Sequence, residues 1–247
     1  NPFLPPPASP PPLPSADGRT RHSMRAYSES KQLELATPAH VVFAFDTLVS
    51  HLSHNGTAPT PTFQDATTAL FVTWNVSPRP GSSQRRLRGC IGILEPRRLH
   101  TALRDYALTA ALNDRRFAPV SPREVPSLEC TVSLLSCFEE AAAWDDWEIG
   151  THGLVIEFTD PATHVRRNAT FLPEIAAEHA WSKRDTMREL VRKAGYEGEA
   201  DASLLGSLRV TRYQSSKCTL TYAQYAACRD EVGEGAPPPL ATAVVQA

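Results

Sequence analysis

The chain has 247 residues, a net charge of −2 at neutral pH and a hydrophobic content of 41%. This near-neutral balance argues against nonspecific nucleic-acid binding over the whole surface. No apolar run approaches the roughly 20 residues of a transmembrane helix, and no signal-peptide pattern is present, so we expect no membrane partner.

The cysteines indicate an intracellular protein without a metal site. Their number is odd and no two of them form a C-x-x-C pair, which predicts neither a disulfide framework nor a zinc site. We therefore expect reduced thiols, no metal and no cofactor. The chain begins with Asn1 rather than Met, which favours a piece trimmed from a longer protein. The five cysteines are Cys90, Cys130, Cys137, Cys218 and Cys228.

Two tails flank one predicted domain. Residues 1–36 open with proline runs and then become polar and charged, so they cannot bury enough apolar surface to offset the entropy of ordering. Residues 230–247 are acidic and rich in Pro and Ala. We predict a disordered N-terminal tail, a domain over residues 37–229 and a frayed C-terminal tail.

The domain is predicted to begin with a buried helix. Thr37 is suited to the N-cap and Pro38 to the first turn. The apolar residues that follow cover most of the helix circumference, so the helix should be largely buried as far as residues 54–56. Its histidines, His40, His51 and His54, are interpreted as surface or flank residues rather than ligands.

A hairpin and a second helix should follow. Residues 69–76 and 85–94 are β-prone runs joined by a loop with two prolines, which predicts a long hairpin. Apolar residues then recur at helical spacing up to Asn113, and the position of this helix directly after the hairpin predicts that it packs on the same sheet. The residues that set this spacing are Leu99, Leu103, Tyr106 and Ala110.

The second half of the domain repeats this alternation of strands and helices. A capping-box pattern predicts a helical turn at residues 121–124, and Gly195 is placed to end a helix. The remaining predicted elements are a strand at 130–135, a hairpin of 154–158 with 165–171, helices from Pro173 and from Ser182, strands at 208–213 and 219–222, and a short final helix. Hairpins alternating with helices indicate an α+β fold, with a hint of internal duplication.

We interpret the stretch Arg88-Gly89-Cys90-Ile91-Gly92 as the one place where the sequence encodes chemistry locally. Side chains alternate along a strand, so Arg88, Cys90 and Gly92 share a face. A cation next to a thiol favours the thiolate, and glycine lets another molecule approach the backbone closely. The stretch therefore predicts either a reactive thiol or a binding groove.

A series of motifs in this order resembles the AMMECR-domain family, named for a chromosomal region linked to Alport syndrome, midface hypoplasia and elliptocytosis. The resemblance covers about residues 40–228 and leaves out both tails. The motifs are Leu70-Phe71-Val72-Thr73-Trp74, Leu87-Arg88-Gly89-Cys90-Ile91-Gly92, Arg104-Asp105-Tyr106, Asp114-Arg115-Arg116-Phe117, Val132-Ser133-Leu134-Leu135, Trp147-Glu148-Ile149-Gly150, His152-Gly153, Leu172-Pro173-Glu174 and Thr211-Arg212-Tyr213.

The resemblance implies a eukaryotic member with a barrel-like, largely antiparallel sheet, flanking helices and a cleft at the signature strand. It implies a regulatory role in the cytoplasm, the nucleus or both, and in prokaryotes such proteins associate with Memo-like and radical-SAM proteins. The family has no settled activity, so the resemblance determines the fold far better than the function.

One functional interpretation is a cysteine-centred enzyme. Cys90 would be the nucleophile, and a nucleophile of this kind commonly needs a base that a third group orients. His152, between two glycines, is the candidate base, with Glu148 or Asp114 to orient it and His100 as a weaker option. The opposing interpretation is that Cys90 is a small buried hydrophobe in a core strand, with Gly89 and Gly92 present for tight packing.

The second interpretation is a binding or adaptor module. Gly89 and Gly92 would then form a groove, Arg88 and Arg116 would bind a carboxylate or phosphate through paired hydrogen bonds, and the proline-rich tail would recruit a protein partner. A third, nucleic-acid binding, rests on paired arginines alone, which are typical of a solvated face. The sequence does not indicate which oligomeric state the protein has, and it leaves these three interpretations open.

Overall fold

The structure is a computed structural model that describes residues 35–53, 59–77 and 84–232. Nearly all of the predicted N-terminal tail, residues 54–56 where the first helix was predicted to end, most of the first hairpin loop and the chain beyond residue 232 lie outside these residues. None of the helices in the described part of the chain is long and apolar enough to cross a membrane.

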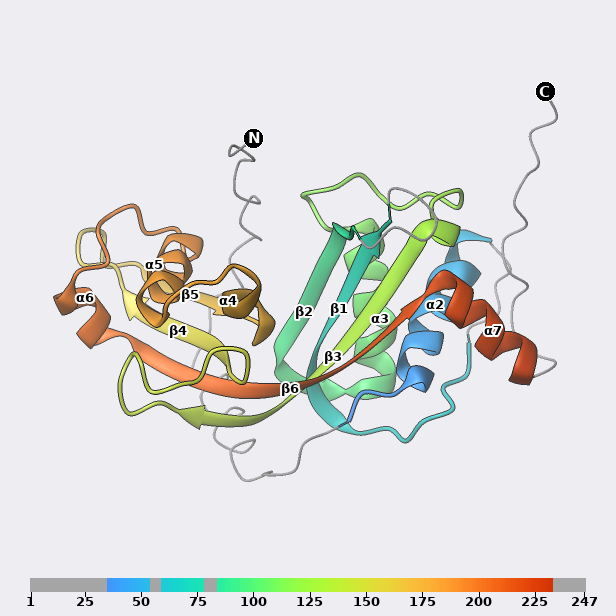
Figure 1. Cartoon of the computed structure of the whole chain (residues 1–247), viewed down its shortest axis with the longest axis horizontal. Helices are drawn as coiled ribbons and strands as arrows, with labels where there is room; N and C mark the ends of the chain where they lie inside the picture. Colours follow the sequence, from blue (N-terminus) through green and yellow to red (C-terminus); the bar gives the residue numbers. More distant parts are fainter. Residues whose placement is uncertain (1–34, 54–58, 78–83, 233–247) are drawn as a thin grey trace. The chain divides into compact units, whose positions relative to one another are not determined.

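The described elements confirm the predicted α+β class and the largely antiparallel sheet (Figure 1). The strand order is β2-β1-β3-β6-β4-β5. In chain order the elements are α2 (Pro38–Leu52), β1 (Thr67–Val76), β2 (Arg86–Arg98), α3 (Leu99–Leu112), a 3-10 turn η1 (Val125–Ser127), β3 (Leu128–Glu140), β4 (Gly153–Thr159), β5 (Arg166–Phe171), α4 (Glu174–Glu178), α5 (Lys183–Lys193), α6 (Ala202–Ser207), β6 (Arg209–Thr221) and α7 (Tyr222–Val232).

The described residues form two compact units. One, the His152 unit, comprises residues 135–215, and the other, the Cys90 unit, comprises residues 35–134 and 216–232. The strands β3 and β6 each contribute residues to both units. Each unit contains an antiparallel hairpin followed by helix: β1–β2 is followed by α3, and β4–β5 is followed by α4 and α5. This shared order is compatible with an internal duplication, which stays a prediction.

The helix α2 begins where the sequence predicts, but one of its histidines has a different role. Thr37 is the N-cap, and the Thr37 backbone N–H donates to Nδ1 of His40 at 2.9 Å. His40 is only 6% exposed and packs against Phe63, with 4.2 Å between the ring centroids. The interpretation of His40 as a surface residue is therefore wrong, because it takes the place of the Glu or Gln that completes a capping box.

The β1–β2 hairpin packs against α3 in the core of the Cys90 unit, as the sequence predicts, and α2 and β3 contribute to the same core (Figure 1). Leu70, Val72 and Trp74 on β1 are fully buried, and the Trp74 Nε1 donates to the Ala107 carbonyl of α3 at 3.0 Å. The glycine opposite Trp74 is Gly89, and a Cβ built on it would lie 1.9 Å from the Ala110 carbonyl oxygen. The helix therefore occupies the space that a side chain at residue 89 would need.

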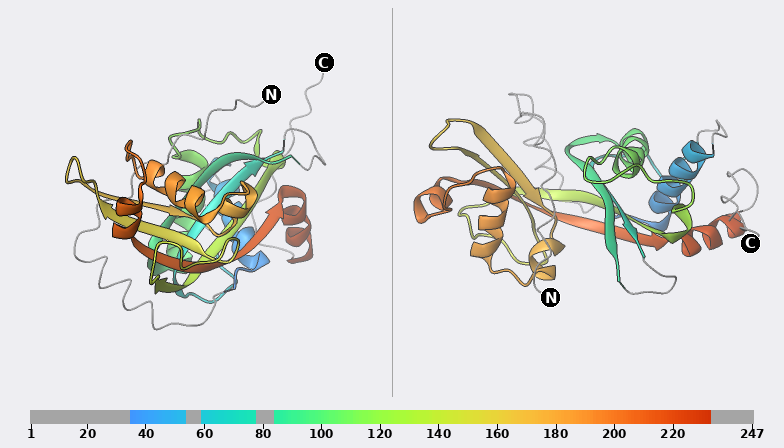
Figure 2. Two further views of the ribbon diagram at one scale, coloured as in Figure 1. Left: turned by 60° about the vertical axis from the view of Figure 1, so that its left-hand side comes forward. Right: turned by 90° about the horizontal axis from the view of Figure 1, so that it is seen from above.

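In the His152 unit, the local end signals of the helices are confirmed. Ser182 caps α5 in a capping box with Asp185, and Gly195 follows the helix with φ of +82°. The prediction of two short strands, at residues 208–213 and 219–222, is wrong, because a single strand, β6, runs without interruption from Arg209 to Thr221. Figure 2 shows the hairpin strands β4 and β5 lying side by side in both views.

The end of α4 carries an alanine in a conformation that favours glycine. Ala180 has φ of +51°, and the Trp181 N–H donates to the Ala176 carbonyl at 3.0 Å, the bond pattern of a Schellman cap. We expect Ala180→Gly to raise the free energy of unfolding by about 0.5 kcal/mol, because relief of the left-handed strain outweighs the added chain entropy. Urea unfolding measures the change.

The matched control is Ala177→Gly in the body of the same helix. This exposed alanine lies within the helical turn, where glycine costs about 1 kcal/mol. Equal destabilisation by both substitutions would show that the Ala180 backbone carries no strain.

Candidate functional site

Cys90 lies in β2, which is the first strand in the order of the sheet. It is half-buried and pairs with Thr73 of β1, two residues along from the pair of Gly92 with Phe71. The Thr73 hydroxyl donates to the Cys90 sulfur, with 3.1 Å between Oγ1 and Sγ. The side of β2 opposite α3 thus presents a thiol that is already hydrogen-bonded by a neighbouring strand.

Gly92 is covered by a neighbouring side chain. A Cβ on Gly92 would lie 2.3 Å from Cγ of Phe71, so the Phe71 ring lies over this glycine. Gly89 faces α3. Neither glycine of the signature leaves an empty groove at its own position, and a role for either in ligand binding stays a prediction.

Asp114 and Arg116 bind the backbone of Cys90 at the edge of β2. The Cys90 N–H donates to Oδ2 of Asp114 at 3.0 Å, and Nη2 of Arg116 donates to the Cys90 carbonyl at 3.2 Å. The two side chains also pair with each other, with Nε to Oδ1 at 2.9 Å and Nη2 to Oδ2 at 2.7 Å. This ion pair satisfies the N–H and C=O that an edge strand would otherwise leave for another strand.

The electrostatics of this pair favour the charged forms of both residues. Burial raises the pKa of Asp114, but hydrogen bonds from Arg116 and from the Cys90 backbone lower it, and the net shift is downward. Burial lowers the pKa of Arg116, but the hydrogen bond and charge of Asp114 raise it, and the negative charge of an ionised Cys90 adds to that rise. Arg116 and an ionised Cys90 therefore stabilise each other electrostatically.

Arg88, the cation that the sequence places beside Cys90, is engaged in another contact. Its Nε donates to Oε1 of Glu124 at 2.8 Å, and its other nitrogens donate to Glu124 Oε2 and to the carbonyls of Ala118 and Pro119. The hydrogen bond from Arg88 is the largest cause that lowers the pKa of Glu124 to about 2. Arg88 thereby fastens the segment after α3 to β2.

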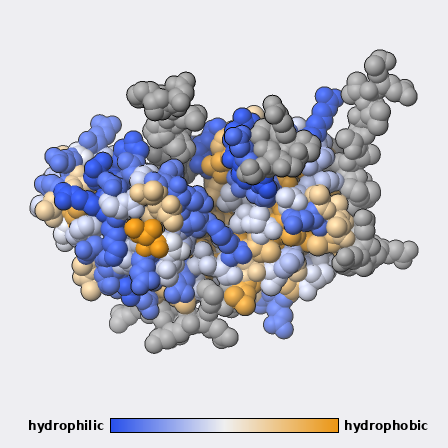
Figure 3. Space-filling view, in the orientation of Figure 1, coloured by the Kyte–Doolittle hydropathy of each residue, from blue (hydrophilic) through white to orange (hydrophobic). Residues whose placement is uncertain are grey.

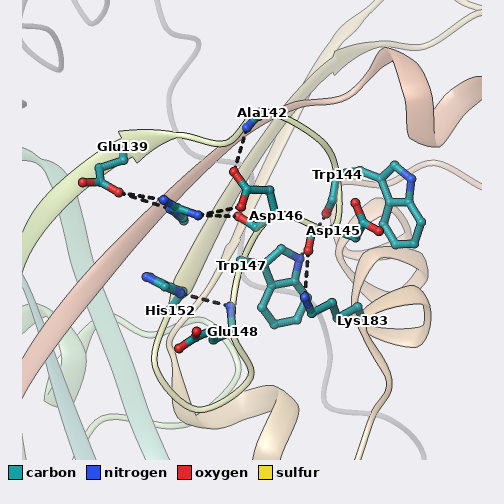
Figure 4. Close-up of polar contacts among 10 residues, drawn as sticks. Glu139, Ala142, Trp144, Asp145, Asp146, Trp147, Glu148, His152 and Lys183 are labelled. Carbon is teal, nitrogen blue, oxygen red and sulfur yellow. Dashed lines mark hydrogen bonds and ion pairs between the residues drawn. The ribbon is translucent and has the colours of Figure 1, made fainter.

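His152 belongs to a separate group of polar contacts in the His152 unit (Figure 4). Its Nδ1 accepts a hydrogen bond from the Glu148 backbone N–H at 3.0 Å, in the turn that leads to β4. Burial and the Arg212 charge lower the pKa of His152. A neutral ring that accepts at Nδ1 carries its proton on Nε2, so in this state His152 is a hydrogen-bond donor.

Residues of the neighbouring elements β3, β6 and α5 bind one another or this loop. Arg212 pairs with Glu139 at 3.0 Å and with Asp146 at 2.9 Å, and the Lys183 ammonium donates to the Asp145 carbonyl at 2.8 Å (Figure 4). On the face seen in Figure 3, hydrophilic side chains predominate over this unit. These contacts hold the loop that carries His152 and Glu148.

The predicted site residues therefore fall into two groups. Cys90, Asp114 and Arg116 are in direct contact in the Cys90 unit, and His152 and Glu148 are together in the His152 unit. The pairing of Cys90 with His152 as nucleophile and base stays a prediction. His100, the weaker candidate, bonds the Phe63 carbonyl through Nε2 at 2.8 Å.

Thr73 and Glu124 are site residues that the sequence reasoning did not identify. Strand pairing could have signalled Thr73, since it is the cross-strand neighbour of Cys90. No group of three or more His, Cys, Asp or Glu residues that could hold a metal occurs in the described residues. None of the five cysteines, all of which the structure describes, forms a disulfide.

The paired arginines are mostly neutralised. Of the eight arginines in the pairs Arg85/Arg86, Arg97/Arg98, Arg115/Arg116 and Arg166/Arg167, five form ion pairs with carboxylates of the described residues, which lowers the charge that they offer to a nucleic-acid backbone. The five are Arg85 with Glu129, Arg97 with Glu95, Arg98 with Asp65, Arg116 with Asp114 and Arg167 with Asp160.

Comparisons with known proteins agree on one family. The AMMECR1 family model matches residues 41–218. An uncharacterized protein of Arabidopsis thaliana is 49% identical over 74% of this chain and 85% of its own length, and one of Schizosaccharomyces pombe is 41% identical over 57% of this chain and 70% of its own. The crystal structure of an uncharacterized protein from Pyrococcus horikoshii has the same fold, with a TM-score of 0.59 and 23% identity over 73% of this chain and 90% of that one.

Proposed function

The chain belongs to the AMMECR1 family, and from that premise we propose that it binds a small anionic ligand beside Cys90. Arg116 would recognise a carboxylate or phosphate of the ligand, and the Cys90 thiol would contact the ligand or attack it. The signature strand with Asp114 and Arg116 would form the active-site or binding cleft, in a regulatory protein of the cytoplasm, the nucleus or both.

The observation that carries this proposal is the hydrogen bonding of Arg116. A guanidinium has five N–H donors, and Asp114 and Cys90 take up Nε and Nη2. Nη1 has no partner among the described residues, the side chain is 14% exposed, and its Cζ lies 5.4 Å from the Phe117 ring centroid. Donors held in a fixed direction next to a thiol favour an anion over a neutral ligand.

The test measures how far inorganic phosphate or succinate slows the alkylation of Cys90 by iodoacetamide. Mass spectrometry follows the extent of alkylation at each cysteine. We expect Arg116→Lys to raise the half-protecting concentration about tenfold, equivalent to about 1.4 kcal/mol, because lysine is a point charge without the fork geometry. Sodium chloride at equal ionic strength separates specific binding from screening.

Arg115→Lys is the matched control, since the adjacent Arg115 is exposed. It should leave protection unchanged. Equal protection in both variants, or no protection of the unsubstituted chain by either anion, would contradict the proposed ligand site.

The catalytic form of the proposal is tested by the pH dependence of the same alkylation. A nucleophilic Cys90 should show an apparent pKa below the ordinary thiol value of about 8.5. A value at or above 8.5, or an unreactive thiol, would leave the non-catalytic alternative, an adaptor for peptides or nucleic acids. In that case Cys90→Ser should keep ligand binding and Arg116→Ala should weaken it.

A further inference from the structure

Thr73 is placed to act on Cys90. The two residues face each other across the β1–β2 ladder, and Oγ1 of Thr73 donates to Sγ of Cys90 over 3.1 Å in a part-buried position. Threonine is branched at Cβ, so its hydroxyl takes few directions on a strand. The donor is therefore fixed toward the sulfur by the backbone pairing itself.

We infer that Thr73 is a positioning residue that stabilises the thiolate of Cys90 by donating a hydrogen bond to its sulfur. The inference rests on the proposed function, in which Cys90 contacts or attacks the ligand. Sulfur in the thiol is a weak acceptor, whereas a thiolate accepts strongly, so the same hydroxyl bond stabilises the charged form more than the neutral one.

Among the described residues, the charged groups named here near the Cys90 thiol lie on β2 and on the segment that follows α3. Arg116 interacts favourably with an ionised Cys90, while Asp114 opposes that charge but is itself paired with Arg116. Arg88, on the same strand, is paired with Glu124. The helix α3 meets the opposite side of β2 at Gly89 through the Ala110 backbone, which carries no charge. Thr73 is the neutral donor in this set, so its effect can be separated from that of the charges.

The test is the pH profile of Cys90 alkylation in Thr73→Val, which keeps the branched shape and removes the donor. We expect the apparent pKa of Cys90 to rise by about one unit and the alkylation rate at neutral pH to fall by up to about tenfold. Thr73→Ser should restore the rate, which a purely structural role of the methyl group would not do.

Thr131→Val is the control, because the Thr131 hydroxyl bonds Thr219 at 2.8 Å and not a cysteine. It should leave the profile of Cys90 unchanged. If Thr73→Val does not fold, as judged by near-ultraviolet circular dichroism, the same comparison is made between Thr73→Ser and Thr73→Ala.

The outcomes separate this inference from the proposed function. A low apparent pKa that persists in Thr73→Val, or in Thr73→Ala, overturns the role of Thr73 and leaves the reactive thiol intact. An unreactive Cys90 in the unsubstituted chain overturns the catalytic form of the proposed function itself.

Discussion

Gly89→Ala should be the most damaging single-methyl change in the described chain, with a loss of about 3 kcal/mol or more in the free energy of unfolding. The added Cβ would lie 1.9 Å from the Ala110 carbonyl oxygen and 3.0 Å from its carbon, and both atoms belong to the backbone. No side-chain rotation relieves this overlap, so α3 must move away from β2 and the Trp74 bond to Ala107 must stretch. Urea unfolding of the two proteins measures the difference.

Gly206→Ala is the matched control, because a Cβ at Gly206 meets nothing within 4 Å and the residue lies in α6. Alanine in a helix is favoured over glycine by up to about 1 kcal/mol, so this substitution should leave the protein equally stable or more stable. If the two substitutions gave the same small effect, α3 could not be packed on the strand as described.

The helices could be predicted from the sequence where their signals are local. Thr37 with Pro38 marks the start of α2, Ser182 with Asp185 marks the start of α5, and Gly195 follows its end. Each of these signals depends on contacts within about four residues, which hold in any tertiary context. Hairpin pairing was predictable because the two strands of each hairpin follow one another directly in the sequence.

Contacts between distant segments could not be predicted in this way. The sequence left open whether Gly89 borders a groove or allows tight packing, and the structure shows that it gives room to a helix 21 residues further along the chain at Ala110. The sequence places Arg88 two residues from Cys90, but its acidic partner Glu124 is 36 residues away. Parity along a strand determines which side chains share a face and says nothing about which distant charge neutralises them.

In the candidate site, too, individual residues could be predicted from the sequence but the contacts between them could not. The sequence identified Cys90, Asp114 and Arg116 separately, and the structure joins them through the backbone of β2. Thr73 was visible only as part of a β-prone run, since the register that sets it opposite Cys90 depends on the hairpin as a whole. A site that depends on cross-strand neighbours can therefore be predicted only once the register of the strands is known.

Asp114→Asn should cost about 3 kcal/mol of unfolding free energy at neutral pH. The Asp114 side chain is 2% exposed, and it accepts from both Arg116 and the Cys90 N–H. An asparagine keeps one acceptor and turns an NH₂ group toward the guanidinium, which leaves the Arg116 charge without a counter-ion in a largely buried place.

The pH dependence of the free energy of unfolding tests whether the Asp114 carboxylate is the cause of the stability lost in Asp114→Asn. The pKa of Asp114 is lowered in the folded protein, so its stabilisation is fully present above the unfolded value of about 3.9 and is lost as the pH falls through the lower folded value. The stability gap between the unsubstituted protein and Asp114→Asn should stay constant from about pH 8 to about pH 5 and narrow below about pH 4. Glu124 titrates in both proteins and cancels in this difference. Asp105→Asn, on the exposed side of α3, is the control and should change the free energy of unfolding by less than about 0.5 kcal/mol at any of these pH values. If the stability gap for Asp114→Asn did not narrow in acid, the ion pair with Arg116 could not be the source of that gap.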